Sequence, residues 1–173
     1  MIYFIRHGET DFNRHSKIQG QLDIPLNDTG IKQAETARDN LADLEFDLIY
    51  SSPLLRARKT AEIINEKHGV EIVFDDRLKE FFIGSVQGEC VKEWSDEKWD
   101  EVHHHPENFG GETLETFINR VTECFVEIEK LNKNILIVAH GGCYRAIYKY
   151  VNNMEGFDFD IEGAKNAVAI KIR

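Results

Sequence analysis

Two kinds of hydrophobic pattern alternate along this chain of 173 residues. Short continuous apolar runs, rich in β-branched and aromatic residues, predict buried strands. Longer stretches in which apolar side chains recur every three or four residues predict helices that cover those strands. The predicted strands span residues 2–5, 46–50, 70–74, 135–139 and 168–172, and the apolar stripes of the predicted helices run over residues 31–44, 57–64, 114–128 and 144–151.

The ends of the first two helices carry local signals. Asn27-Asp28-Thr29-Gly30 supplies capping and turn chemistry before the first helix. Ser51-Ser52-Pro53 places a candidate N-cap and a proline at the start of the second helix, and Gly69 ends it. Residues 78–90 and 106–113 combine weak periodicity with glycine or proline, so we expect loops there.

The alternation of strands and helices predicts an α/β layered fold with a largely parallel sheet, built by residues 1–173 as one domain. In such folds, ligands bind beyond the carboxyl ends of the strands. Two of the predicted strands end in similar sequences, Arg6-His7-Gly8 and His140-Gly141-Gly142. We therefore expect the two histidines to meet at one edge of the sheet.

The charge balance limits the classes of partner. The chain carries 31 acidic and 21 basic residues, a formal net charge of −10, which argues against nucleic acid and anionic membranes. An anionic substrate would need a few clustered arginines to reverse the field locally. No apolar run is long enough to span a bilayer, no secretion signal is visible, and the three cysteines lack disulfide or zinc spacing. These features predict a cytoplasmic protein.

A series of motifs accompanies the two strand-end histidines. Arg6-His7-Gly8-Glu9-Thr10 resembles the signature of the histidine phosphatase superfamily, also called phosphoglycerate mutase-like. Further motifs follow at that family's spacing across almost the whole chain: Asn13, Gln19-Gly20, Asp23-x-Pro25-Leu26, Gly30, Gln33-Ala34, Ser51-Ser52-Pro53-Leu54-x-Arg56-Ala57 with Thr60-Ala61, Leu78-x-Glu80 with Gly84 and Gly88, Gly110-Gly111-Glu112, and Val138-Ala139-His140-Gly141-Gly142. The resemblance implies a three-layer α/β/α sandwich with a largely parallel mixed sheet. It also implies a phosphatase that works through a phosphohistidine.

These residues suit phosphoryl transfer on chemical grounds. A neutral imidazole held in one tautomer is a good nucleophile for a phosphoryl group, and we assign that role to His7. Arg6 and Arg56 each offer a fork of donors to phosphate oxygens, and with His140 they would replace the charge of a metal ion. We assign general acid and base catalysis to Glu80. We therefore expect no metal and no organic cofactor.

Further residues are predicted to bind the substrate together with Arg6 and Arg56. Asn13 and the amides near Gly141 are candidate donors to phosphate oxygens. The amides are candidates because a glycine loop that opens a helix is a natural anion site. Gln19 and Gly20 belong to one of the family's motifs and are expected in the same pocket. The predicted ligand is a small-molecule phosphate ester.

Three other groups of residues suggest different chemistry. His103-His104-His105 resembles a metal site, but consecutive side chains diverge, and we interpret this run as a solvated loop. Cys143 is interpreted as a buried core residue, because no arginine follows any cysteine at the spacing that a cysteine-dependent phosphatase needs. Asp158-Phe159-Asp160 lies too near the end of the chain to build the fold of an aspartate-nucleophile phosphatase.

The interval between Glu80 and Gly110 bears on the reaction. Mutases of this family resemble one another in carrying a long, partly basic insertion there, whereas this interval is short and acidic, which favours a phosphatase over phosphoglycerate mutase-type transfer. The compact phosphatases that act on α-ribazole phosphate, or on sugar and nucleoside monophosphates, resemble the chain in size. A phosphate-binding module without activity is the non-enzyme alternative.

Two expectations about the pocket follow from the same interval. Its carboxylates should lie at the pocket mouth, so the substrate should carry little negative charge beyond its reacting phosphate. Val86-Gln87 replaces an aromatic and an acidic residue that the family often shows, and this departure should alter the packing of the pocket.

Overall fold

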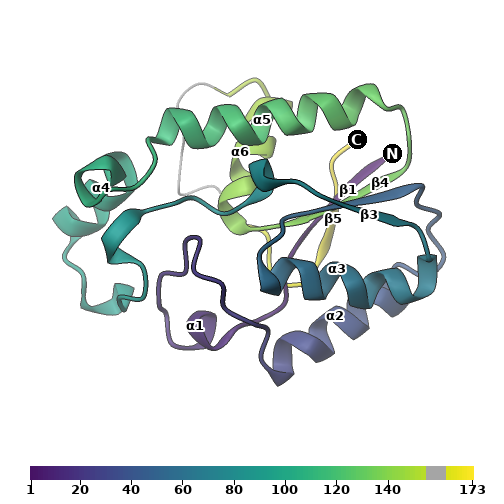
Figure 1. The fold of residues 1–173 in the computed structure, drawn as a ribbon, viewed down its shortest axis with the longest axis horizontal. Coiled ribbons are helices and arrows are strands. Elements are labelled where there is room, and N and C mark those ends of the chain that lie inside the picture. Colours follow the sequence, from purple (N-terminus) through teal and green to yellow (C-terminus); the bar gives the residue numbers. More distant parts are fainter. Residues whose placement is uncertain (155–162) are drawn as a thin grey trace.

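The computed structural model describes residues 1–154 and 163–173 and contains a five-stranded sheet between two layers of helices (Figure 1). The strand order is β3-β2-β4-β1-β5, in which β5 runs antiparallel to β1 and the other neighbours are parallel. The predicted sandwich with a largely parallel mixed sheet is confirmed. Its strands are β1 (Ile2–Arg6), β2 (Leu48–Ser51), β3 (Glu71–Phe74), β4 (Ile135–Ala139) and β5 (Ala169–Lys171). The Asp158-Phe159-Asp160 segment lies outside the described residues.

Alternate side chains of the strands point to opposite faces of the sheet and pack into two hydrophobic cores. One face of the sheet packs against α2 (Asp28–Asn40) and α3 (Leu55–His68), and the other against α5 (Leu114–Lys130) and α6 (Gly141–Val151). Every residue of β4 is buried because it has a strand on each side and helices on both faces, which explains its continuous apolar run. No helix among the described residues has the length and apolarity needed to cross a bilayer.

Two helix boundaries differ from the sequence prediction. The first long helix ends at Asn40 rather than near residue 44. The second helix begins at Leu55 with Leu54 as its N-cap, so the prediction of a serine N-cap is wrong. Ser52 instead directs its hydroxyl oxygen to a histidine ring described below. Gly69 ends this helix in the left-handed conformation, as predicted.

The segments beyond the strand ends contain short helices, some of them within the predicted loops at residues 78–90 and 106–113. They are α1 (Asp11–Arg14), α4 (Asp96–His104) and the 3₁₀ helices η1 (Asp76–Leu78), η2 (Gly84–Val86), η3 (Val91–Glu93) and η4 (Pro106–Phe109). Backbone hydrogen bonds join the segment after α1 to the segment between η2 and η3. The amides of Ile18, Gly88 and Val91 donate to the carbonyl oxygens of Glu89, Ile18 and Ser16, respectively. In Figure 1, α1 and α4 both lie to the left of the strands, beyond the same edge of the sheet.

The loop after β1 also packs tightly against the start of α2. A Cβ atom added to Gly30 would lie closer than 3.0 Å to three backbone atoms of Glu9. A Cβ atom on Gly8 would meet the carbonyl group of Gly30 in the same way. The close contact between the backbone at Gly8 and Glu9 and the backbone at Gly30 fixes the loop that follows His7.

We predict that Gly30→Ala destabilises the protein, although alanine inside a helix is normally favoured over glycine by about 1 kcal/mol. The clash with Glu9 should lower the free energy of unfolding by about 1–3 kcal/mol and slow the hydrolysis of p-nitrophenyl phosphate, because the displaced loop carries His7. Urea unfolding and initial rates measure the two effects.

Gly69→Ala is the matched control. Gly69 has left-handed backbone angles, but nothing lies within 4 Å of its added Cβ atom. This variant should lose about 1–2 kcal/mol through backbone strain and keep its activity. A Gly30→Ala protein as stable and as active as the unchanged chain would show that the contact does not fix the loop.

Candidate active site

The two strand-end histidines lie together at the carboxyl edge of the sheet. Arg6 pairs with Ala139 across the parallel β1 and β4, so the residues that follow, His7 and His140, leave the sheet side by side. Their ring centroids are 5.2 Å apart. Both side chains are buried, with 2% and 0% of their surfaces exposed.

His7 is held in one tautomer. Its Nδ1 atom lies 2.7 Å from the carbonyl oxygen of Gly8, which can only accept, so Nδ1 carries the proton. The Nε2 atom accepts a hydrogen bond of 3.3 Å from Nε of Arg56. Burial, followed by the positive charges of Arg56 and Arg6, holds the pKa of His7 well below its ordinary value. The ring is therefore neutral at pH 7, with an unprotonated Nε2.

Arg56 is fully buried on α3 and organises the loop after α1. Besides His7, it donates to the carbonyl oxygens of Leu22 at 2.8 Å and Gly20 at 2.7 Å. Gly20 has φ +48°, a conformation that favours glycine. Burial lowers the pKa of Arg56 to about 10, so the guanidinium stays charged at neutral pH. It has five N–H donors, and three hydrogen bonds leave two for a ligand.

Two buried nitrogens at this edge have no hydrogen-bond partner among the described residues. They are Nε of Arg6 and Nδ1 of His140. Nε2 of His140 lies 2.8 Å from the hydroxyl oxygen of Ser52. Burial, and then the charge of Arg56, lowers the pKa of His140 well below its ordinary value. Because buried polar groups are normally paired, both nitrogens are candidate donors to an anionic ligand.

Thr10 orients the two predicted amide side chains. Its hydroxyl oxygen lies 3.1 Å from Oδ1 of Asn13 and 2.9 Å from Oε1 of Gln19, and it caps α1. Both amide oxygens therefore face Thr10. The NH₂ groups of Asn13 and Gln19 are left to donate to a ligand, and both residues line the cavity described below.

Glu80 is fixed through both carboxylate oxygens. Oε1 accepts from the amide of Phe81 at 2.9 Å, and Oε2 accepts from the amide of Gly142 at 3.3 Å. The second bond ties Glu80 to the start of α6. The carboxylate therefore lies next to the first turn of α6, which follows His140 directly.

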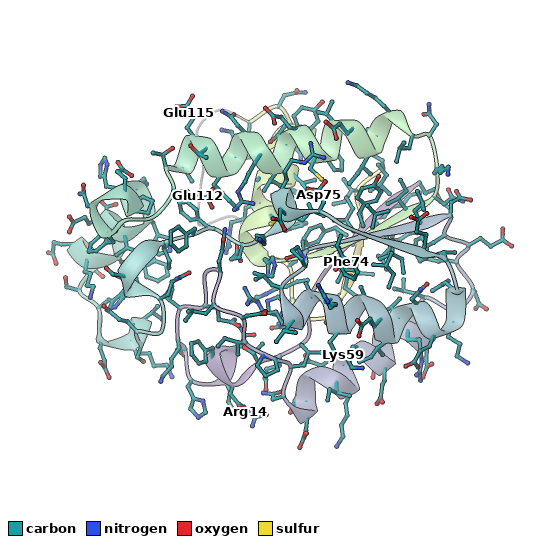
Figure 2. All side chains as sticks on the ribbon, in the orientation of Figure 1. Arg14, Lys59, Phe74, Asp75, Glu112 and Glu115 are labelled. Carbon is teal, nitrogen blue, oxygen red and sulfur yellow. The ribbon has the colours of Figure 1, made fainter. Side chains whose placement is uncertain are left out.

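The backbone around Glu80 is clamped by Arg120 of α5. All five N–H donors of Arg120 are used, to the carbonyl oxygens of Arg77, Lys79 and Glu80 and to both oxygens of Glu112. Glu112 also accepts from the amide of Phe82 at 2.9 Å. Figure 2 labels Glu112 in the segment that leads into α5. No periodicity or motif in the sequence marks Arg120.

A cavity of about 210 Å³ brings most of these side chains together. The predicted residues that line it are Arg6, His7, Asn13, Gln19, Gly20, Arg56 and Glu80. His140 and Gly141 do not line it, and the His140 ring lies behind the ring of His7, with the two centroids 5.2 Å apart. Seven lining residues were not predicted as site residues, namely Lys17, Ile18, Phe81, Ile83, His103, Gly142 and Arg145. Arg145 could have been found from its helical spacing, because it lies one turn after Gly141 on α6.

The expectation of a solvated loop at His103-His104-His105 is wrong for its first two residues. His103 and His104 end α4 rather than forming a solvated loop, and their Nδ1 atoms lie 2.8 and 3.0 Å from carbonyl oxygens one turn earlier. The acidic residues of this segment are also absent from the described cavity wall, to which residues 89–107 contribute only His103. Several pair within the segment itself: Glu89 with Lys98, Asp100 with His104, and Glu107 with His105.

Two smaller expectations can be compared with the structure. Cys143 is fully buried, and burial raises the pKa of its thiol well above the ordinary value, so it is a core residue rather than a nucleophile. Gln87 accepts a hydrogen bond of 2.6 Å from the amide of Gln21, and Val86 is buried in the core. Gln87 therefore supports the turn that begins at Gly20, while Val86 contributes to the core.

Comparison with known proteins gives concordant matches. The chain is 36% identical over 166 residues to the uncharacterized phosphatase PhoE of Bacillus subtilis, with 95% of this chain and 82% of that protein covered. It is 31% identical to a metal-independent phosphoserine phosphatase of Arabidopsis thaliana, with 98% and 76% covered. A mycobacterial glucosyl-3-phosphoglycerate phosphatase, solved with VO₃, superposes with a TM-score of 0.83 at 29% identity, with 97% and 90% covered.

The family model of the histidine phosphatase superfamily, branch 1, matches residues 2–172. That match spans the strands, the cavity and both strand-end histidines. The chain belongs to the histidine phosphatase superfamily.

Proposed function

We propose that this protein hydrolyses a small phosphomonoester through a phosphohistidine on His7. The observation that carries the proposal is the state of His7, a neutral ring whose unprotonated Nε2 lies in a cationic cavity 3.3 Å from Nε of Arg56. A neutral imidazole beside fixed positive charge is arranged to attack a phosphoryl group whose charge is being neutralised.

In the first step, the lone pair on Nε2 of His7 attacks phosphorus and the bond from phosphorus to the ester oxygen breaks. Arg6, Arg56 and the amide of Asn13 hold the phosphoryl oxygens, and the unpartnered Nδ1 of His140 donates to one of them. Glu80 supplies the proton that the leaving alkoxide takes up. Nδ1 of His7 keeps its proton throughout, and its N–H group donates to the carbonyl oxygen of Gly8.

In the second step, water attacks the phosphorus atom of the phosphohistidine. Glu80, now a carboxylate, accepts the proton of that water as the N–P bond breaks. The bonding electrons return to Nε2 of His7, inorganic phosphate leaves, and the site regains its first state. One carboxyl group therefore serves both half-reactions.

A mutase would need to keep water from the phosphohistidine while its bound ligand reorients. The short interval between Glu80 and Gly110 offers less cover than the long insertion of the family's mutases, which favours hydrolysis. A binding module would have no need of a carboxyl group clamped by Arg120. We therefore propose a phosphatase that acts on a small-molecule ester without a cofactor.

We predict that Glu80→Gln separates the two steps. With an alkyl phosphate, phosphorylation of His7 should slow by about 10²–10⁴-fold, because the alkoxide leaves without a proton. With p-nitrophenyl phosphate the phenolate leaves unaided, so one equivalent should be released in a burst before the phosphoenzyme stalls. Rapid mixing and mass spectrometry of the acid-labile adduct measure this.

His7→Ala is the control and should show no burst. Steady turnover of Glu80→Gln without accumulated phosphoenzyme would assign the proton transfers to another group. The aryl ester is therefore the substrate on which the assignment depends.

We predict that chelation leaves the rate unchanged. Arg6 and Arg56 already place positive charge beside His7, which is the role that a divalent ion fills in metal-dependent phosphatases. The comparison with a metal-independent phosphoserine phosphatase supports this expectation. Initial rates before and after dialysis against EDTA test it, and loss of activity that Mg²⁺ restores would refute it.

We predict that Arg120→Lys impairs the placement of Glu80, because lysine cannot make five hydrogen bonds in one plane. Turnover of an alkyl phosphate should fall by up to about 10²-fold, with little change in KM. The burst with p-nitrophenyl phosphate should change far less, since that step needs no proton.

Arg38→Lys is the matched control, since Arg38 pairs with Asp39 and Glu66 on the surface. It should leave both esters unaffected. The ratio of the two rates does not depend on how much of the variant is folded. Equal losses on both esters would mean that Arg120 only stabilises the fold.

A further inference from the structure

The peptide group between Gly8 and Glu9 decides which nitrogen of His7 carries the proton. Its carbonyl oxygen lies 2.7 Å from Nδ1 of His7. Because a carbonyl oxygen only accepts hydrogen bonds, the proton of the neutral ring lies on Nδ1 and the lone pair lies on Nε2. The other end of the same peptide group is the N–H of Glu9, so the group can be held from two sides.

The opposite orientation of this peptide group would move the proton. If the group turned over, the N–H of Glu9 would face Nδ1 of His7, and Nδ1 would have to accept. The neutral ring would then carry its proton on Nε2, the attacking atom of the proposed reaction, against the N–H of Arg56 at 3.3 Å. Gly8 has no side chain that restricts its backbone angles, so contacts with the rest of the chain must select the orientation.

Gln33 of α2 holds the end of the peptide group that points away from His7. Its Oε1 atom accepts a hydrogen bond of 2.8 Å from the amide of Glu9. Gln33 lies about one turn after Gly30, whose backbone contacts Glu9. The hydrogen bonds to His7 and to Gln33 therefore hold the two ends of one peptide group.

The preceding peptide group, between His7 and Gly8, is also held at both ends. Its carbonyl oxygen accepts from Nδ2 of Asn166 at 2.8 Å, and its N–H donates to Oγ1 of Thr60 at 3.1 Å. The hydroxyl of Thr60 donates in turn to the carbonyl oxygen of Arg56 at 2.7 Å. Its proton is therefore used, and its oxygen is left to accept from Gly8.

These three side chains surround the loop without reaching the ligand. Gln33 lies on α2 and Thr60 on α3, two helices that lie side by side in Figure 1, and Asn166 precedes β5. Thr60 is fully buried. None of the three lines the described wall of the cavity. Any effect that they have on the reaction must therefore pass through the loop that carries His7.

We propose that Gln33, Thr60 and Asn166 are positioning residues that set the tautomer of His7 by holding the peptide groups on either side of Gly8. Removal of one of these hydrogen bonds lets the loop populate the orientation in which Nε2 carries the proton. A ring in that tautomer has no lone pair with which to attack phosphorus. The kinetic consequence rests on the proposed phosphohistidine function, whereas the tautomer is observable without any substrate.

Imidazole ¹⁵N spectra measure the tautomer directly, because the protonated and unprotonated nitrogens of a neutral ring resonate far apart. His7→Ala assigns the His7 signals among the seven histidines. We expect a protonated Nδ1 and an unprotonated Nε2 in the unchanged chain. Gln33→Met removes the acceptor for the Glu9 amide, so the two resonances should move towards each other. Gln33→Glu keeps an acceptor oxygen and should restore the positions seen in the unchanged chain.

Thr60→Val tests the preceding peptide group with a side chain of the same shape. Thr36→Val is the matched control, because Thr36 is an exposed threonine of α2 whose hydroxyl also donates to the carbonyl oxygen four residues earlier, that of Lys32. Both variants lose that bond within the helix, but only Thr60→Val leaves the amide of Gly8 without its partner. Thr60→Val should shift the His7 resonances, and Thr36→Val should not.

The burst of nitrophenol in the Glu80→Gln background gives the kinetic readout. At saturating p-nitrophenyl phosphate, its amplitude counts folded enzyme and its rate reports the attack by His7. Gln33→Met and Thr60→Val should each slow the burst by about tenfold, the effect of one hydrogen bond on a two-state equilibrium. The amplitude should stay the same, and Thr36→Val should change neither quantity.

Unchanged His7 resonances in both Gln33→Met and Thr60→Val would overturn the proposal. A lower burst amplitude at an unchanged rate would also overturn it, because the side chains would then only stabilise the fold. The absence of any acid-labile adduct in the Glu80→Gln background would instead overturn the proposed function, and the tautomer measurement would be unaffected. The two failures are therefore distinguishable.

Discussion

The parallel pairing of β1 and β4 is the constraint on which the site depends. Its register sets Arg6 opposite Ala139, so the first residues beyond the two strands are His7 and His140. β2 pairs with the other side of β4 in the same direction, which brings Ser52 to the same edge, within 2.8 Å of His140. The imidazoles are thus placed by backbone hydrogen bonds, before any interaction between their side chains.

Burial of charge at this edge explains both the organisation of the loops and the state of His7. Desolvation lowers the pKa of Arg56 to about 10, and the carbonyl oxygens of Gly20 and Leu22 offset part of that cost. Burial of the His7 ring, and then the charge that remains on Arg56, lowers the pKa of His7 and keeps it unprotonated. The same guanidinium therefore shapes the pocket wall and maintains the proposed nucleophile.

The sequence predicts the elements whose apolar pattern is long enough to read. β4 has the predicted bounds because its continuous run can only be a strand buried on both faces, and the strand-end motifs place the histidines. Helices of four residues or fewer, such as α1 and η2, are too short for a 3.6-residue period. Arg120 could not be found, since its partners are backbone oxygens that appear only once the chain has folded.

The segment from Glu89 to Glu107 shows why a count of charges does not give the field in a site. Its acidic composition is plain in the sequence, but the direction of each carboxylate depends on how the segment folds. Lys98, His104 and His105 pair with three of those carboxylates, and the side chain of this segment that reaches the described cavity wall is His103. Because exposed charges more than about 10 Å apart are largely screened at ordinary ionic strength, the few cations on the cavity wall outweigh the acidic surface at the position of the ligand.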